Sequence, residues 1–313
     1  MTLTARPDYR SRTALRRWGY RLLPGDGFSY LLHMRPLEWP IMVAHTALGF
    51  FLAVGWNVSA GGGFGPLLGG LAIWVVLLNG GTLAINSAFD RDEGDVGYLD
   101  APPPPPRHLF VFSLALMAAG QVLAFALFPL LFGIAYAVCF LMSILYSVPP
   151  FRWKAVAGLD LVINAWGFGT LTPLAGWAIT GQPVPAWAVL TLLAFCPLFT
   201  SLYPLTQLYQ YEEDRARGDR TLALVLGMRR SLQLAILAML VAFALLAAGV
   251  LTGPAGRWWP SLGFAFLAWL AVLLPWYRRY PRMDTAEHKR GMYAALHAWA
   301  ITDIAVLLTF TLA

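Results

Sequence analysis

Two short stretches of the sequence carry oxygen-bearing side chains at a spacing that suits a divalent cation. In the first, Asn86 and Asp90 stand four residues apart, so on a helix they share one face and lie one turn apart. In the second, Gln207, Gln210 and Asp214 recur at intervals of three and four residues, which predicts one face of another helix. Mg²⁺ typically takes one or two carboxylates together with substrate phosphates and water. The pattern therefore predicts a magnesium site formed by two helix ends.

Arginine and lysine residues near both stretches predict a diphosphate as the ligand of this site. Such side chains bind phosphate oxygens and neutralise a diphosphate leaving group. An allylic prenyl diphosphate would then ionise, and an acceptor would capture its carbocation. Aromatic residues make up 14% of the chain and could stabilise that cation. Charged residues at helix ends are often only solvated, but two clusters with the same kind of spacing favour a shared site.

The composition places this chemistry in a membrane. Apolar residues make up 58% of the 313-residue chain and charged residues 12%, with a mean hydropathy of +0.62. A soluble domain carries roughly 25% charge. Stretches of about 20 apolar residues, the length that spans a bilayer, predict an all-α, polytopic membrane helical bundle of about nine transmembrane helices. The predicted spans are 38–56, 66–88, 108–128, 129–148, 157–181, 185–209, 230–252, 260–276 and 292–312.

The distribution of basic residues predicts an orientation. With nine spans, 21 of the 22 Lys and Arg residues fall on one side, and only Arg257 falls on the other. Cytoplasmic loops carry the Lys/Arg excess, so we expect the N-terminus and the candidate active-site loops on the cytoplasmic face of a bacterial or archaeal cell membrane. Residues 1–37 would form a basic cytoplasmic segment that includes a helix on anionic lipid, and 38–313 the transmembrane domain. Nothing in the sequence suggests a nucleic-acid partner.

The two acidic stretches are part of a predicted internal repeat. Asp90 and Asp214 are separated by the same 124 residues as Lys154 and Arg278. Each acidic stretch is followed by two spans and then a basic, proline-containing loop. Because an even number of spans separates the copies, the repeat is parallel, with four helices in each half and a ninth helix appended. Parallel repeats commonly place a site between their halves.

An ordered set of motifs resembles the UbiA superfamily of intramembrane prenyltransferases. The set runs from residue 35 to about 222, and its members occur in the order typical of that family. Any one of them is a weak signal, whereas the ordered set is fairly specific. The motifs are Arg35-Pro36, Asn86-x-x-x-Asp90-Arg91, Tyr146-Ser147-x-Pro149-Pro150-x-Arg152-x-Lys154, Asn164-Ala-Trp-Gly167, Pro173-Leu-Ala-Gly176-Trp177 and Glu212-x-Asp214-Arg215-x-x-Gly218-x-x-Thr221-Leu222.

The resemblance implies a role for each of these residues. Asn86 and Asp90 would bind Mg²⁺ from the first motif and Asp214 from the second, so both carboxylates would be essential to catalysis. Tyr146 would lie near the reacting carbon. The diphosphate would contact the basic residues of the motifs, which are Arg35, Arg91, Arg152, Lys154, Arg217 and Arg220.

The chain departs from the family pattern at several ligand positions. Ser87 follows Asn86 where the family usually has Asp, and Gly94 stands where a third Asp is common. Carboxylates one and two turns before Asp214 are replaced by Gln210 and Gln207. Either a metal is lost or one of Asp92, Asp95, Glu213 and Asp219 compensates, and spacing does not choose among them. The predicted metal ligands therefore also include Asp92, Asp95 and Gln210.

The substrates of the predicted enzyme are a polyprenyl diphosphate and a lipophilic acceptor, which could be a quinone precursor, a chlorin, a carotenoid or a glycerol-based lipid. Two alternatives remain open. A UbiA-like terpene cyclase would act on the prenyl diphosphate alone, and a transporter or lipid-binding protein would have no turnover. Polar residues within the predicted spans, such as His45 and Asp303, would suit the last class.

Overall fold

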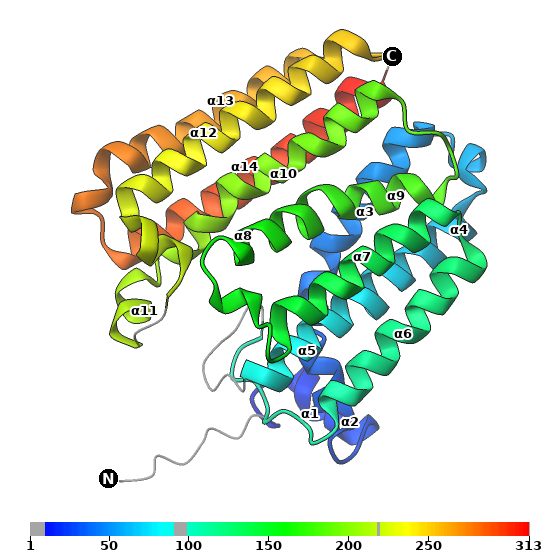
Figure 1. The fold of residues 1–313 in the computed structure, drawn as a ribbon, viewed down its shortest axis with the longest axis vertical. Helices are drawn as coiled ribbons and strands as arrows, with labels where there is room; N and C mark the ends of the chain where they lie inside the picture. Colours follow the sequence, from blue (N-terminus) through cyan, green and yellow to red (C-terminus); the bar gives the residue numbers. More distant parts are fainter. Residues whose placement is uncertain (1–9, 91–98, 218–219, 313) are drawn as a thin grey trace. The chain divides into compact units, whose positions relative to one another are not determined.

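The computed structural model describes residues 10–90, 99–217 and 220–312, and every regular element in these ranges is a helix (Figure 1). The all-α class predicted from the sequence is therefore confirmed. Eight helical segments within the described ranges are long and apolar enough to cross a membrane. They are Gly27–Val54, Phe64–Asp90, Leu109–Leu127, Leu130–Ser147, Ala186–Leu208, Leu222–Thr252, Pro260–Arg282 and Thr285–Thr311.

The predicted span 157–181 is helical but irregular. It consists of α8 (Leu159–Asn164), the π-helical segment η5 (Ala165–Leu171) and α9 (Thr172–Ile179). Pro173 has no N–H to donate within the helix, and the adjoining π turn accommodates that gap. Each piece alone is too short to span a bilayer, so the count of nine spans remains a prediction.

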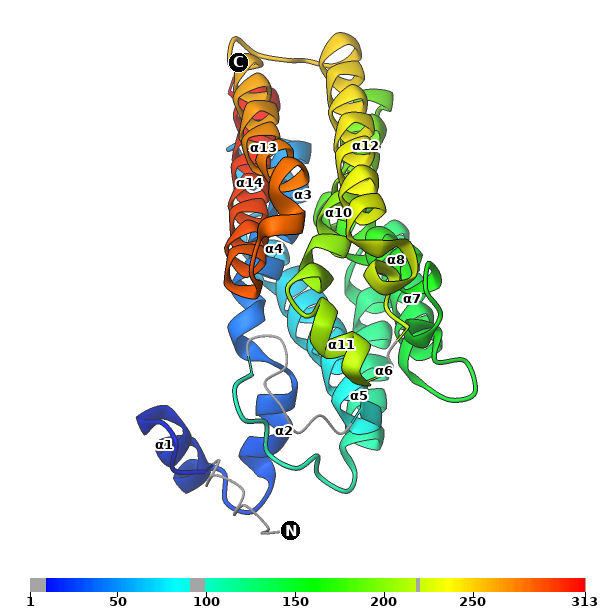
Figure 2. The same cartoon turned by 90° about the vertical axis from the view of Figure 1, so that its left-hand side faces the viewer.

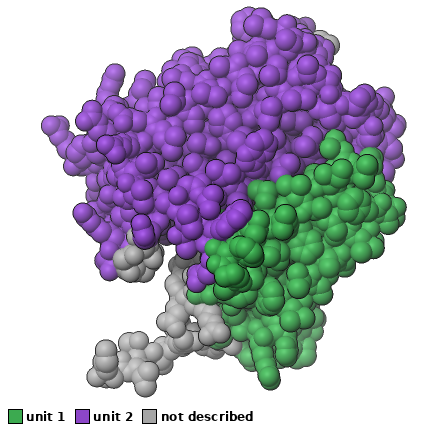
Figure 3. Space-filling model, in the orientation of Figure 1, with its two compact units in different colours: residues 1–44, 69–151 green, residues 45–68, 152–313 purple. Residues whose placement is uncertain are grey.

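The chain divides into two compact units, coloured separately in Figure 3. Unit 1 comprises residues 1–44 and 69–151, and unit 2 comprises residues 45–68 and 152–313. Unit 1 holds α1 (Ala14–Leu22), α2 (Gly27–His33), η1 (Pro36–Glu38), η3 (Ala72–Asn79), α5 (Gly80–Asp90), α6 (Leu109–Leu127) and α7 (Leu130–Ser147). Unit 2 holds η2 (Val58–Gly61), η4 (Trp153–Ala155), α8, η5, α9, α10 (Ala186–Leu208), α11 (Tyr211–Arg217), α12 (Leu222–Thr252), α13 (Pro260–Arg279), η6 (Tyr280–Arg282) and α14 (Thr285–Thr311). Helices α3 (Trp39–Val54) and α4 (Phe64–Leu71) each cross a boundary between the units.

In unit 1, α5, α6 and α7 pack against one another, and α2 packs against α5. The turn expected at Phe128-Pro129 separates α6 from α7, as predicted. Small residues permit close packing: a Cβ on Gly120 would overlap the Tyr136 side chain. Tyr136 is fully buried, and its hydroxyl donates to the Met117 carbonyl (3.0 Å), so its one polar atom is satisfied.

In unit 2, α10, α12, α13 and α14 form a four-helix arrangement (Figures 1 and 2). Helix α10 contacts α12 and α14, while α13 contacts α12 and α14. Their shared core contains large side chains such as Trp269, Trp276 and Phe195. The indole N–H of Trp269 donates to Thr302 Oγ1 (3.0 Å), so α13 and α14 are joined by a hydrogen bond as well as by packing.

Helix α12 starts earlier than the predicted span 230–252. It begins at Leu222 but is broken at Gly227, whose φ of 76° lies in the left-handed region. Glycine adopts such angles without the steric penalty of a Cβ. The apolar run from residue 230 predicted most of this helix, while the preceding apolar segment 222–228 was missed because Arg229 and Arg230 interrupt the run.

Candidate active site

The first predicted motif lies at the end of α5, where α7 supplies its hydrogen-bond partners. The Ser147 hydroxyl donates to Asn86 Oδ1, and one turn earlier Thr82 Oγ1 lies 2.7 Å from Ser143 Oγ. Helices α5 and α7 are thus linked by two polar contacts that lie one helical turn apart on both helices. Asp90 is the last residue of α5, one turn beyond Asn86, as the spacing predicted.

The contact with Ser147 ties the Asn86 side chain to α7. The Ser147 hydroxyl donates to Asn86 Oδ1, which uses one lone pair of the amide oxygen. An amide oxygen has a second lone pair, which can bind a hard cation. The local structure therefore fits the metal role that the sequence predicts for Asn86.

The second predicted motif begins where α10 ends. Helix α10 stops at Leu208, and α11 starts at Tyr211 after a two-residue turn. Asp214 is 3% exposed in α11, and its backbone N–H donates to the Gln210 carbonyl (2.8 Å). The structure thus places the Asp214 carboxylate in a buried position on the short helix that follows α10.

Gln207 has a different function from the one its spacing suggested. Its Oε1 accepts a hydrogen bond from the backbone N–H of Ala223 (2.9 Å), in the first turn of α12. The first backbone N–H groups of a helix have no partner within the helix, so this bond joins the end of α10 to the start of α12. Gln207 therefore stabilises the loop that carries Asp214, while Gln210 lies in the turn before α11.

Two of the predicted diphosphate ligands share an unusual backbone conformation. Arg35 in unit 1 (φ 49°) and Arg152 in unit 2 (φ 39°) are both left-handed. Each precedes a 3₁₀ turn, η1 after Arg35 and η4 after Arg152. Left-handed non-glycine residues cost of order 1–3 kcal/mol and cluster at functional sites. Arg35 is largely buried, with its guanidinium 3.5 Å from Glu38 Oε1, whereas Arg152 is exposed.

The other predicted residues are placed as follows. Tyr146 is half-buried in α7 next to Ser147, and Lys154 is half-buried in η4. Arg220 is exposed just before α12. Arg91, Asp92 and Asp95 lie outside the described residues, as does the side chain of Arg217. Within the described ranges no three His, Cys, Asp or Glu side chains form a metal-binding cluster, so the ligand set remains a prediction.

The two polar residues noted within the spans turn out to be partners. His45 Nδ1 lies 3.4 Å from Asp303 Oδ1, inside unit 2. Asp303 is 15 residues beyond His288 along α14, or about 22 Å at 1.5 Å per residue. His288 shares a pocket with Glu212 of α11, the helix that carries Asp214. Asp303 of α14 has His45 of α3 as its neighbour within unit 2.

Comparison with known proteins defines the class of this membrane protein. A family model described as the UbiA prenyltransferase family matches residues 42–301. The chain is 32% identical over 276 residues to the digeranylgeranylglyceryl phosphate synthase of Natronomonas pharaonis, which covers 84% of this chain and 92% of that protein. The chain belongs to the UbiA prenyltransferase family, and it is an integral membrane prenyltransferase.

Two solved structures show the same fold. The structure of a UbiA homolog from Archaeoglobus fulgidus bound to DMAPP and Mg²⁺ matches with a TM-score of 0.62 and 22% identity, covering 88% of this chain and 99% of that one. A structure described in terms of the biosynthesis of digeranylgeranylglyceryl phosphate synthase in membranes matches with a TM-score of 0.71 and 16% identity, covering 90% and 98%.

Proposed function

We propose that this protein transfers a prenyl group from a polyprenyl diphosphate to a glycerol-based lipid, with Mg²⁺ held by the two predicted motifs on the cytoplasmic side of the membrane. The Natronomonas pharaonis relative supports this acceptor class, since its name describes a glyceryl phosphate with two geranylgeranyl groups. The acceptor would then be the corresponding lipid with one geranylgeranyl group. The structural observation that carries the proposal is the placing of Asn86 and Asp90 one turn apart at the end of α5, with Asn86 held by a hydrogen bond from Ser147.

The reaction replaces one bond to carbon with another. The bond between C1 of the prenyl group and the diphosphate oxygen breaks, C1 bonds to the acceptor oxygen, and the acceptor hydroxyl loses its proton. When bound, Mg²⁺ would neutralise the negative charge that develops on the leaving diphosphate. Asn86, Asp90 and Asp214 supply the oxygen ligands that suit this ion, with Asp92, Asp95 and Gln210 as the further candidates.

Basic side chains would hold the diphosphate from the loops before α3 and α8. Arg35 and Arg152 stand in the same left-handed conformation at the start of these loops, a backbone conformation that is rare for non-glycine residues and clusters at functional sites. Lys154 follows two residues after Arg152, and Arg91, Arg217 and Arg220 are the remaining predicted contacts. Tyr146, next to Ser147 on α7, would face the reacting carbon.

The orientation proposed for the protein follows from charge. Of the 22 Lys and Arg residues, 21 fall on one side in the nine-span topology, which favours a cytoplasmic location for that side. Both acidic motifs and the candidate diphosphate ligands belong to it. The water-soluble product, diphosphate, would therefore leave directly into the cytoplasm.

The test uses the full chain in lipid vesicles with geranylgeranyl diphosphate, the mono-geranylgeranyl acceptor, and either Mg²⁺ or EDTA. We expect a new lipid only with Mg²⁺ and acceptor together. Asp90→Ala and Asp214→Ala should each reduce turnover by at least about 100-fold without a large change in Tm. Asp26→Asn, at an exposed N-cap with no side-chain hydrogen bond, is the matched carboxylate control and should be fully active. A product without acceptor would identify a cyclase instead, and full activity in either alanine variant would refute the metal assignment.

A further inference from the structure

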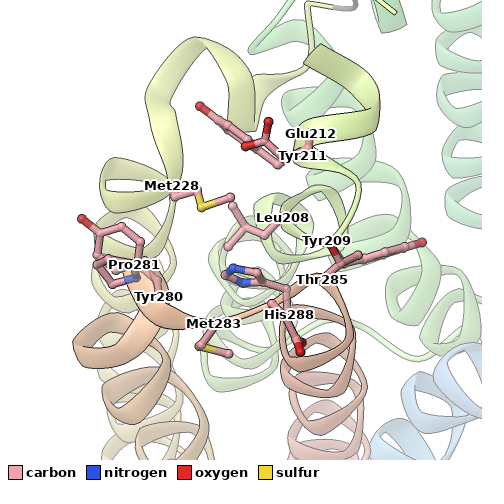
Figure 4. A pocket seen from close by; sticks show the side chains of 11 residues that line it. Leu208, Tyr209, Tyr211, Glu212, Met228, Tyr280, Pro281, Met283, Thr285 and His288 are labelled. Atoms are coloured by element: carbon pink, nitrogen blue, oxygen red, sulfur yellow. The ribbon is translucent and has the colours of Figure 1, made fainter. Parts of the chain in front are cut away.

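A pocket of about 380 Å³ opens in unit 2 where the ends of several helices meet (Figure 4). Leu208 is the last residue of α10, and Thr285 is the first residue of α14. Met228 comes from the start of α12, while Tyr280 belongs to η6. A volume of this size is at the lower end of the range for small-molecule sites. Because its walls are the ends of membrane-spanning helices, the pocket lies at the boundary between the membrane interior and water.

Nε2 of His288 faces this pocket, and its hydrogen-bonding role as a donor follows from the partner of the other ring nitrogen. His288 is only 3% exposed, and its Nδ1 accepts a hydrogen bond from the indole N–H of Trp276 (2.9 Å). An indole nitrogen can only donate, so Nδ1 of His288 carries no hydrogen and Nε2 must carry one. Among the described residues Nε2 has no hydrogen-bond partner, and the ring lies between Leu208 and Met283 in the pocket (Figure 4).

The His288 Nε2–H group is a donor at the wall of this pocket, and an oxygen of a bound ligand could accept its hydrogen bond. The other side chains that line the pocket define which kind of ligand oxygen can bind there. Glu212 and Asp284 are exposed residues of the lining, so an anionic group such as a phosphate would meet two carboxylates there. A hydroxyl suits both surroundings, since it accepts from His288 Nε2 and can donate to a carboxylate.

The rest of the lining is apolar or aromatic. Leu208, Met228 and Met283 form apolar surface, and the rings of Tyr209 and Tyr280 add to it. Methionine side chains adapt to irregular hydrocarbon shapes. The pocket thus combines one directed donor with a flexible apolar wall at the membrane boundary, the level at which the glycerol hydroxyls of neutral lipids lie.

We propose that this pocket binds the uncharged, hydroxyl-bearing head of a neutral glycerolipid, with His288 Nε2 donating to the lipid hydroxyl. The site is separate from the predicted diphosphate ligands, none of which lines it. Its occupation needs neither Mg²⁺ nor turnover, so it is tested independently of the proposed reaction.

The experiment is photo-crosslinking of the full chain in phosphatidylcholine nanodiscs by a dodecylglycerol with a diazirine in its chain, followed by peptide mapping. We expect saturable labelling of the peptides that contain Met228 or Met283. Unlabelled dodecylglycerol should compete, and dodecyl phosphate, the anionic probe of the same chain length, should not. His288→Phe should lower labelling about fivefold, which corresponds to the loss of one neutral hydrogen bond.

Three further variants separate binding from folding. His288→Gln keeps both an acceptor for Trp276 and a donor for the lipid, so it should retain labelling. His297→Phe, on the exposed face of the same helix, is the matched control and should behave as wild type. Met228→Phe fills the pocket from α12 and leaves the Trp276–His288 bond intact, so it should also reduce labelling. Unchanged labelling in both His288→Phe and Met228→Phe, or equal competition by dodecyl phosphate, would overturn the proposal.

Discussion

His45 and Asp303 form a buried polar pair within the membrane-spanning part of unit 2, with Nδ1 of the imidazole 3.4 Å from Oδ1 of the carboxyl group. The other ring nitrogen, Nε2, lies 3.3 Å from the carbonyl of Gly169. That carbonyl has no helical donor at position 173, because Pro173 lacks an N–H. Since a carbonyl oxygen only accepts, Nε2 must carry a hydrogen.

The two ring nitrogens of His45 therefore face different groups: Nε2 faces the Gly169 carbonyl, and Nδ1 faces the carboxyl group of Asp303. Polar groups are costly to bury without such neighbours. The rings of Phe195 and Trp299 pack against the imidazole, with centroids 4.9 and 5.2 Å away.

We predict that replacing His45 lowers the free energy of unfolding more than replacing Asp303 by its amide does. His45→Phe leaves both the Gly169 carbonyl and Asp303 without this partner, and should lower the free energy of unfolding by roughly 1–3 kcal/mol. Asp303→Asn should cost much less, because its amide can still donate to Nδ1. Thermal unfolding of the purified variants measures the difference, and equal losses of Tm would show that the contact of His45 with the Gly169 carbonyl adds nothing to stability.

Two glycines allow α3 and α9 to approach closely within unit 2. A Cβ on Gly49 would overlap the carbonyl of Pro173, and a Cβ on Gly176 would overlap the carbonyl of Thr46. The obstacles are backbone atoms, which cannot rotate away. We therefore predict that Gly49→Ala and Gly176→Ala each destabilise the protein by about 1–3 kcal/mol.

The control for this prediction is Gly263→Ala. Gly263 lies inside α13 with open space where the methyl group of an alanine would stand, so alanine should be neutral or stabilise the helix by up to about 1 kcal/mol. Chemical or thermal unfolding in one detergent compares all three variants. If Gly263→Ala lost as much Tm as the other two, the effect would not come from the contact between α3 and α9.

The sequence predicted the helical class, most of the membrane spans and the placing of Asn86 and Asp90 one turn apart on one helix, because apolar runs and local spacing are visible in a single chain. It did not predict that Gln207 would accept from Ala223, since that contact depends on how a loop folds back. Nor did it predict that His45 and Asp303 would meet, although each was visible as a polar residue in an apolar run. Contacts between residues far apart in the sequence leave no signal in a single chain. Only covariation of the two positions among many related sequences would reveal them.

The irregular parts of the fold were harder to predict from the sequence for a similar reason. An apolar stretch predicts a helix whether its turns are α or π, so the change at η5 was not visible in the composition. Gly227 stands in the sequence like any other glycine, and only its φ of 76° shows that α12 is broken there.

Ser147 should tune the metal affinity of Asn86. Ser147→Ala removes the hydroxyl that donates to the amide oxygen, and loss of such a supporting contact typically costs 10–100-fold in metal affinity. We predict a weakening of about tenfold in Mn²⁺ binding, measured by the loss of the free-ion EPR signal, and a parallel rise in the Mg²⁺ concentration that activates turnover. Ser143→Ala is the control, since Ser143 is one turn earlier on α7 and contacts Thr82 rather than Asn86. A weakening of the same size in both variants would point to a general loosening of α7.

Helix α1 presents an apolar face away from unit 1. Leu15, Trp18 and Leu22 are 63%, 60% and 57% exposed. On the opposite face Arg16 donates to the Ala101 carbonyl (2.9 Å), and Gly19 packs against Phe28. Because the inward face is fixed by these contacts, the apolar stripe is free to enter a membrane surface.

We therefore predict that α1 lies on the membrane with this stripe in the acyl region and its arginines among anionic head groups. Nitroxide labels on Leu15→Cys and Leu22→Cys, in a chain with Cys139→Ala and Cys196→Ala, should be relaxed mainly by oxygen. A label on Arg17→Cys, on the exposed polar side of the same helix, should be relaxed mainly by a water-soluble nickel complex. The contrast should be larger in vesicles with anionic lipid than in phosphatidylcholine alone, because arginine side chains are attracted to a negative surface. Equal nickel accessibility at all three positions would mean that α1 stands in water and its apolar face has another partner.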